Sequence, residues 1–85
     1  MTDAEILADL SRILGDLLAD DSLQVTMETQ RKDVPAWDSF AYINFIVAVE
    51  QKFGVKFGVG EVEAFDTVSS IVRRIKDASP NRNAG

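Results

Sequence analysis

Ser39 and the acid before it, Asp38, are the residues whose types and position could support chemistry in this chain. Both are good N-cap residues, so one interpretation is that the pair only begins a helix. In a second interpretation the Ser39 hydroxyl carries a phosphate ester, because free N–H groups and the dipole at a helix start favour an anion. A third makes Ser39 the nucleophile of a hydrolase. The chain has no histidine, so a serine–histidine–aspartate system is impossible and we expect no catalytic residue.

Composition and charge exclude several other kinds of site and partner. The 85 residues include no cysteine and no histidine, which excludes disulfide bonds and thiolate or imidazole metal sites, and we expect no metal. The net charge is −5, and the first 30 residues carry seven acids and one base. An acidic chain repels the nucleic-acid backbone, so we expect no nucleic acid. A basic protein partner is favoured, and solubility is the alternative role of the acids.

The first element that must support the Ser39 region is an amphipathic helix. Thr2 and Glu5 have the spacing of a capping box at its start. An apolar stripe follows and ends near Ala19, before two aspartates that would oppose the dipole of a helix C-terminus. Gly15 interrupts this helix at a cost of about 1 kcal/mol relative to alanine. The stripe consists of Ile6, Leu7, Leu10, Ile13, Leu14, Leu17 and Leu18.

A long connection, residues 20–37, comes next. Its apolar residues alternate, as do those of residues 55–59, so a pair of short strands is one alternative. We favour extended loops whose apolar residues pack against helices. A connection of this length without regular structure is unusual and is often functional. The alternating residues are Leu23, Val25 and Met27 in one segment and Val55, Phe57 and Val59 in the other.

Three further helical segments are predicted. Residues 39–53 form a second main helix, with Gly54 well suited to its C′ position, and residues 59–65 form one short turn. Asp66 or Thr67 can cap a last helix. The inward residues of that helix are Val68, Ile71, Val72 and Ile75.

These segments predict an all-α fold. We expect a small four-helix bundle of three main helices and a short third helix, with a long loop after the first helix. Residues 1–77 are predicted to form the domain and residues 78–85 a flexible polar tail.

The second main helix has more apolar positions than one core face requires. On a helical wheel these positions fall on two adjoining arcs. The inward arc holds Tyr42, Phe45, Ile46, Val49 and Phe53. The other arc, called here the second strip, holds Phe40, Ile43 and Val47. We interpret the second strip as a docking surface for partner proteins, with packing beneath the long loop as the alternative.

The segment from Trp37 to Val55, WDSFAYINFIVAVEQKFGV, resembles the Asp-Ser-Leu motif and second helix of acyl carrier proteins. The long loop, the short third helix and the last helix match the layout of that family, so the resemblance covers nearly the whole chain. In the family, the serine receives 4′-phosphopantetheine from coenzyme A through a separate magnesium-dependent transferase. The resemblance therefore implies covalent 4′-phosphopantetheine on Ser39, with Asp38 as the preceding acid.

The function implied by the resemblance is covalent shuttling, in which the chain itself catalyses nothing. Acyl intermediates of fatty acid or polyketide biosynthesis are held as thioesters. The implied partners are a phosphopantetheinyl transferase and the enzymes that load and transfer acyl groups. Docking is expected at the second strip and at Glu50, an acid that the helix keeps. We expect a cytoplasmic monomer with no membrane span, because the longest apolar run, residues 45–49, is far too short.

Departures from the family pattern bear on the pathway. Phe40 stands where leucine is usual, and Trp37 stands where glycine is common. Ala41, Asn44 and Gln51 occupy positions that are acidic in fatty-acid carriers. We therefore expect a specialised pathway rather than general fatty-acid synthesis. The competing hypothesis is an unmodified helical interaction module that uses the second strip.

Overall fold

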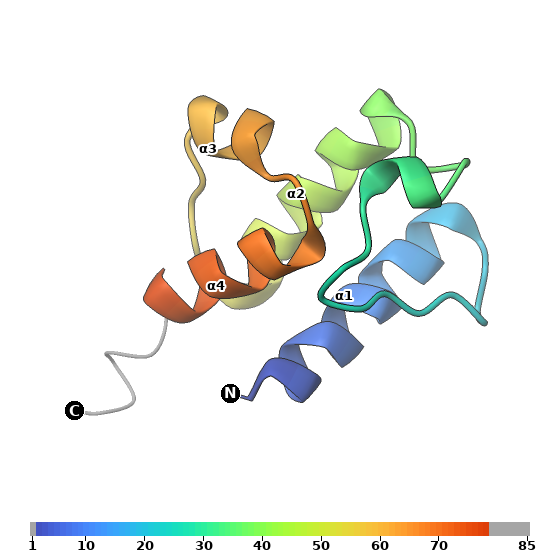
Figure 1. Ribbon diagram of the computed structural model, residues 1–85, viewed down its shortest axis with the longest axis horizontal. Coiled ribbons are helices and arrows are strands. Elements are labelled where there is room, and N and C mark those ends of the chain that lie inside the picture. Colours follow the sequence, from blue (N-terminus) through green and yellow to red (C-terminus); the bar gives the residue numbers. More distant parts are fainter. Residues whose placement is uncertain (1, 79–85) are drawn as a thin grey trace.

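The computed structural model describes residues 2–78, which form four α-helices and one short 3-10 helix (Figure 1). In chain order these are α1 (Asp3–Leu18), η1 (Arg31–Asp33), α2 (Ser39–Phe53), α3 (Val59–Ala64) and α4 (Val68–Ala78). The all-α class and the four-helix layout predicted from the sequence are confirmed. Residues 2–78 contain no strand, so the alternative of paired strands is wrong.

Helix α1 begins and ends as local chemistry requires. The Thr2 hydroxyl accepts from the Glu5 N–H, and the Glu5 carboxylate accepts from the Thr2 N–H, a bond that lowers the pKa of Glu5. At the other end Ala19 is left-handed (φ 55°), and the Asp20 N–H donates to the Gly15 carbonyl at 2.9 Å. A Cβ on Gly15 would lie 2.8 Å from the Asp20 carbonyl oxygen. Glycine thus permits this close turn. The unfavourable helix propensity of Gly15 did not predict this role.

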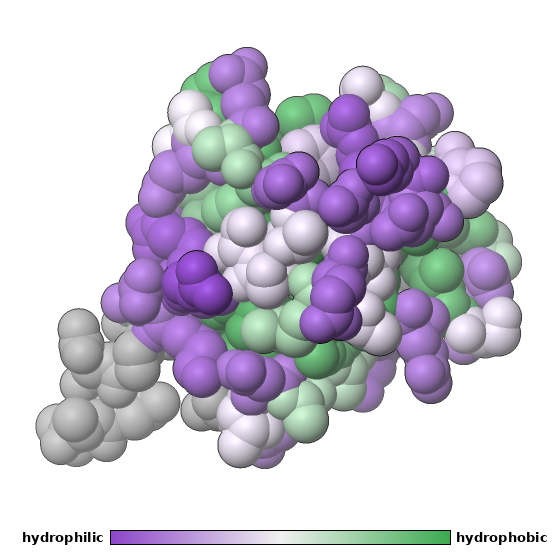
Figure 2. All heavy atoms as spheres, viewed as in Figure 1, coloured by the Kyte–Doolittle hydropathy of each residue, from purple (hydrophilic) through white to green (hydrophobic). Residues whose placement is uncertain are grey.

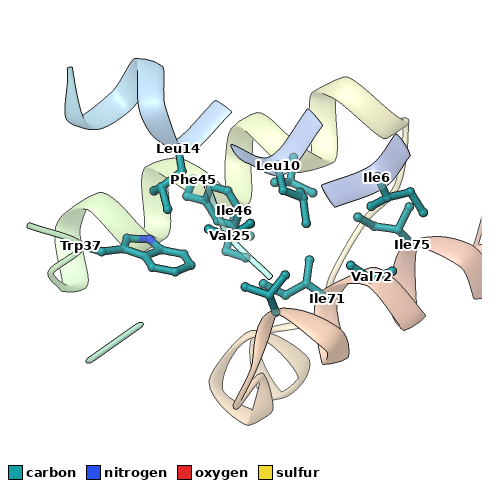
Figure 3. Packing of buried hydrophobic residues seen from close by; sticks show 12 residues of the cluster. Ile6, Leu10, Leu14, Val25, Trp37, Phe45, Ile46, Ile71, Val72 and Ile75 are labelled. Atoms are coloured by element: carbon teal, nitrogen blue, oxygen red, sulfur yellow. The ribbon is translucent and has the colours of Figure 1, made fainter. Parts of the chain in front are cut away.

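The core lies between α1, α2 and α4 and also takes two side chains from the long connection (Figure 3). Val25 and Trp37 are both buried there. For Val25 this confirms the prediction that apolar residues of the extended connection pack against helices. The Trp37 ring lies edge-on to Phe45, with centroids 5.1 Å apart. Its Nε1 is buried without a hydrogen-bond partner among the described residues. This lowers the stability of the fold by about 1–3 kcal/mol and partly offsets the stabilisation from burying the apolar ring. The helical members of the core are Ile6, Leu10, Leu14, Phe45, Ile46, Val49, Val68, Ile71, Val72 and Ile75.

The start of α4 is tied to the long connection rather than to a side-chain cap. The Val68 N–H donates to the Thr29 carbonyl at 2.9 Å, and the Ser69 N–H donates to the Met27 carbonyl at 3.0 Å. The Thr67 hydroxyl bonds the Ser69 hydroxyl instead. The expected capping by Asp66 or Thr67 is therefore replaced by backbone carbonyls from 40 residues upstream, which fix this loop against α4.

Helix α3 is too short to be stable alone and is held by its neighbours. The Arg74 Nε donates to the Glu61 carboxylate at 2.6 Å, and this bond is the main cause of the lowered pKa of Glu61. Arg74 also donates to the Lys56 carbonyl, and the rings of Phe57 and Phe65 meet edge-to-face.

The C-terminal boundary differs by one residue from the predicted one. Ala78, assigned to the tail from the sequence, is the last residue of α4, and the rest of the predicted tail lies outside the described residues. No helix within residues 2–78 has the length and apolar character needed to cross a membrane.

Candidate functional site

Ser39 is the first residue of α2, and its neighbour Asp38 supplies the cap. The Asp38 Oδ1 accepts from the Ala41 N–H at 2.9 Å, and its carbonyl accepts from the Tyr42 N–H at 2.8 Å. Ser39 is exposed, and its hydroxyl makes no hydrogen bond with the rest of residues 2–78. Asp38 thus performs the capping that the simplest interpretation gave to the pair, and the Ser39 hydroxyl is left accessible for chemistry.

An open groove of about 720 Å³ adjoins Ser39. Its walls are η1 and the following loop on one side, the first turn of α2 at one end, and α3 with the start of α4 on the other side. The lining includes apolar side chains such as Ile43 and Val62 and polar ones such as Gln30 and Thr67. Two cations, Arg31 and Lys32, and two acids, Glu63 and Asp66, lie along it. Among the described residues, no group of three or more His, Cys, Asp or Glu side chains is placed to hold a metal ion.

Tyr42, one helical turn after Ser39, links the two walls of this groove. Its hydroxyl donates to the Val62 carbonyl of α3 at 2.7 Å, and the Arg31 guanidinium lies 4.8 Å from its ring centroid. Burial raises the pKa of Tyr42, while the positive charge of Arg31 acts in the opposite direction. The phenol is therefore protonated at neutral pH and remains a donor to α3.

The second strip is exposed. Phe40, Ile43 and Val47 have 78%, 53% and 44% of their surface accessible, whereas Phe45 and Val49 on the inward arc have 1% and 0%. The wheel assignment of the two arcs is confirmed for these residues. The alternative that the second strip packs beneath the long loop is wrong. Of the inward arc, Tyr42 and Phe53 are only partly buried, so Phe53 belongs to the edge of the core.

Glu50 has a structural contact in addition to its predicted docking role. Its Oε2 accepts from the Phe57 N–H at 2.8 Å, and the side chain is partly buried. This bond ties the end of α2 to the segment that leads into α3. Docking at Glu50 stays a prediction.

The sequence did not predict the contribution of Arg31 and Tyr42 to this region. Arg31 precedes Ser39 by eight residues in a connection without helical periodicity, so no local pattern joins the two. Tyr42 was assigned to the inward arc, and only the tertiary fold shows that its hydroxyl reaches α3.

Comparisons with known proteins agree with this geometry. A family model described as a phosphopantetheine attachment site matches residues 37–75. The acyl carrier protein of Helicobacter pylori (strain ATCC 700392 / 26695) is 34% identical over 70 residues, 81% of this chain and 88% of that protein. The acyl carrier protein of Thermotoga maritima is 32% identical over 72 residues, 85% and 89% of the two chains. The solution NMR structure of holo acyl carrier protein from Geobacter metallireducens has a TM-score of 0.79 and 31% identity, and the match covers 92% of this chain and 88% of that one.

Four helices around one core, with an accessible serine at the start of the second, define a small carrier domain. The chain belongs to the acyl carrier protein family. Members of this family carry acyl groups for biosynthetic enzymes and are not themselves catalysts, so the expectation that this chain is no enzyme is confirmed. The expected cofactor, phosphopantetheine, is confirmed by the family model and by the holo structural relative.

The residues near Ser39 fit such a prosthetic group. An attachment hydroxyl must be reachable by another protein, and Ser39 is exposed with no competing hydrogen bond within residues 2–78. The adjoining groove has both apolar and polar lining residues, as an amide-containing arm requires.

Proposed function

We propose that this chain carries acyl groups as thioesters on 4′-phosphopantetheine attached to Ser39. The observation that supports Ser39 most directly is its free, exposed hydroxyl at the first residue of α2, beside a cap supplied by Asp38. In the attachment, the Ser39 oxygen loses its proton to the transferase or solvent and bonds to the pantetheine-side phosphorus of coenzyme A. The pyrophosphate P–O bond of coenzyme A breaks, and adenosine 3′,5′-bisphosphate leaves. Intact mass after incubation with coenzyme A and a phosphopantetheinyl transferase tests the proposal.

The chain's own residues contribute position rather than catalysis. When bound, phosphopantetheine supplies a terminal thiol that holds the acyl group. Asp38 fixes the backbone at the attachment point, and Trp37, two residues before Ser39, is itself buried in the core. Tethering raises the effective concentration of the acyl group at the active site of any enzyme that binds the carrier.

We place partner docking on the second strip, with Glu50 at its far end. The partners are the transferase and the enzymes that load and transfer acyl groups, which act on a cytoplasmic, monomeric carrier. The support is that three large apolar side chains are exposed on the helix that begins at Ser39, although apolar residues of a small monomer are normally buried.

Val47→Glu is expected to leave the fold intact and impair docking. Because Val47 is 44% exposed, its free energy of unfolding should change by about 0.5 kcal/mol or less. Rates of phosphopantetheine transfer and of acyl transfer by a partner enzyme should fall. Val49→Glu is the matched control, because Val49 is fully buried and a charge there should unfold the domain. Wild-type rates in a folded Val47→Glu protein would refute docking at this position.

We further propose a specialised pathway rather than general fatty-acid synthesis. The support is that exposed Asn44 and Gln51 stand where acids are expected on this helix. Ala41, the third such position, is partly buried and packs against the core, so an acid there would disturb the fold.

Docking of this carrier should therefore depend only weakly on salt. Each exposed ion pair contributes about 0–1 kcal/mol, and about 1.4 kcal/mol corresponds to a tenfold change in affinity. Elongation of the loaded wild-type by a fatty-acid ketosynthase should be poor and decline little with salt, because salt screens charges and not apolar contacts. Asn44→Glu combined with Gln51→Glu should improve elongation and make it salt-sensitive. Efficient wild-type elongation with a steep salt dependence would assign the carrier to general fatty-acid synthesis.

The second candidate function, favoured by the same exposed strip, is an unmodified interaction module. It differs in one observable, since such a module gains no mass from coenzyme A and the transferase.

A further inference from the structure

The end of the long connection brings two cations that have no ion-pair partner within residues 2–78 to the groove that contains Ser39. Arg31 and Lys32 both line this groove and are exposed. Within residues 2–78 the ion pairs are Arg12 with Asp9, Arg74 with Glu61, and Lys76 with Asp3, and none of them uses Arg31 or Lys32. Figure 2 shows hydrophilic side chains gathered over the part of this face where η1 lies.

The backbone that carries these cations, and the guanidinium of Arg31, are held in place relative to Ser39. From η1 onward the chain makes successive backbone hydrogen bonds, from the Val34 N–H to the Arg31 carbonyl and from the Trp37 N–H to the Val34 carbonyl. Trp37 is then buried in the core, and Asp38 caps α2. Contact of the Arg31 guanidinium with the Tyr42 ring places the charge about one helical turn along α2 from Ser39.

The charges already present at Ser39 explain why cations would matter there. A phosphodiester on Ser39 carries a permanent negative charge, and it would lie next to the Asp38 carboxylate. The nearby acid on η1, Asp33, accepts from the Gln30 N–H, and Glu63 and Asp66 lie along the opposite wall of the groove. A guanidinium and an ammonium at this position offset that repulsion, and the planar fork of arginine matches two phosphate oxygens.

We propose that Arg31 and Lys32 form a binding site for the phosphodiester that joins the arm to Ser39. This inference rests on the proposed attachment at Ser39. The site holds the first atoms of the arm against the η1 wall of the groove, so that the remainder of the arm leaves Ser39 along the groove.

The test compares holo and apo forms of three proteins. One is the wild-type, one is Arg31→Gln combined with Lys32→Gln, and the control is Lys56→Gln combined with Arg73→Gln. The control removes the same charge from two exposed residues outside the groove. Comparing holo with apo for each protein cancels any purely structural effect of Arg31 on Tyr42.

The first readout is the phosphorus NMR resonance of the holo protein. In the wild-type and the control it should have one position at low salt and move toward the value of the urea-unfolded protein as salt rises. In the Arg31→Gln, Lys32→Gln protein it should already lie near that unfolded value at low salt. Arg31→Lys should retain most of the wild-type position, because it keeps the charge.

The second readout is the thermal midpoint. Attachment should lower the midpoint of the Arg31→Gln, Lys32→Gln protein by about 2–8 °C more than it lowers that of the wild-type or the control. Identical phosphorus positions and identical holo-minus-apo midpoints in all three proteins would overturn the phosphodiester site while leaving attachment at Ser39 intact. Failure of the wild-type to gain any mass would instead refute the proposed function, and this site with it.

Discussion

Ser39→Ala is expected to gain no phosphopantetheine mass under conditions in which the wild-type is converted completely. The oxygen that would bond to phosphorus is absent, so the loss is total rather than partial. The thermal midpoint of the apo protein should hardly change, because Asp38 provides the cap of α2 and Ser39 is exposed. The free energy of unfolding should fall by less than the roughly 1 kcal/mol that the loss of an N-cap costs.

The matched control is Ser70→Ala, which removes a hydroxyl from the first turn of α4 within the region matched by the family model. It should be modified like the wild-type. Intact mass spectrometry of both variants measures the modification, and circular dichroism of the apo proteins measures their folding and thermal midpoints. Modification that persists in Ser39→Ala would move the attachment to another residue and end the proposal for Ser39.

Phe45→Ala is expected to lower the free energy of unfolding by about 3–5 kcal/mol. Phe45 is 1% exposed, and its ring meets the edge of Trp37, so truncation leaves a cavity beside the largest side chain in the core. A small domain has about 5–15 kcal/mol of stability in total. Urea unfolding should show a much lower midpoint with the slope preserved.

Two other phenylalanines on the same helix provide comparison variants for Phe45→Ala. Phe40→Ala should change the free energy of unfolding by about 0.5 kcal/mol or less, because Phe40 is 78% exposed. Phe53→Ala should fall between the two, since Phe53 is only partly buried. Equal midpoints for Phe45→Ala and Phe40→Ala would show that the inward face of α2 is misassigned.

The features predicted most closely from the sequence depend on local chemistry. Helix α2 begins at Ser39 and ends at Phe53 with Gly54 in the left-handed region (φ 67°), as the cap residues and the glycine indicate. Two other features were predictable for the same reason, since each involves residues within a few positions of one another. They are the capping box of α1 and the separation of α2 into a buried and an exposed face.

Most features that the sequence did not predict join segments that are distant along the chain. The start of α4 bonds to the carbonyls of Met27 and Thr29, some 40 residues earlier, where no side-chain pattern records the contact. The approach of Arg31 to Tyr42 likewise depends on how the long connection folds over α2. Trp37 stands out in the sequence only as a departure from a family glycine, although its ring is buried in the core beside Phe45.

The burial of Trp37 has an optical consequence. The chain contains one tryptophan and one tyrosine, and their ring centroids lie 5.9 Å apart. Light absorbed by Tyr42 is therefore transferred efficiently to Trp37, and emission comes from a single buried indole two residues before Ser39. Loading, unfolding and movement of α3 against Tyr42 can each be followed by intrinsic fluorescence, without attaching a dye to so small a carrier.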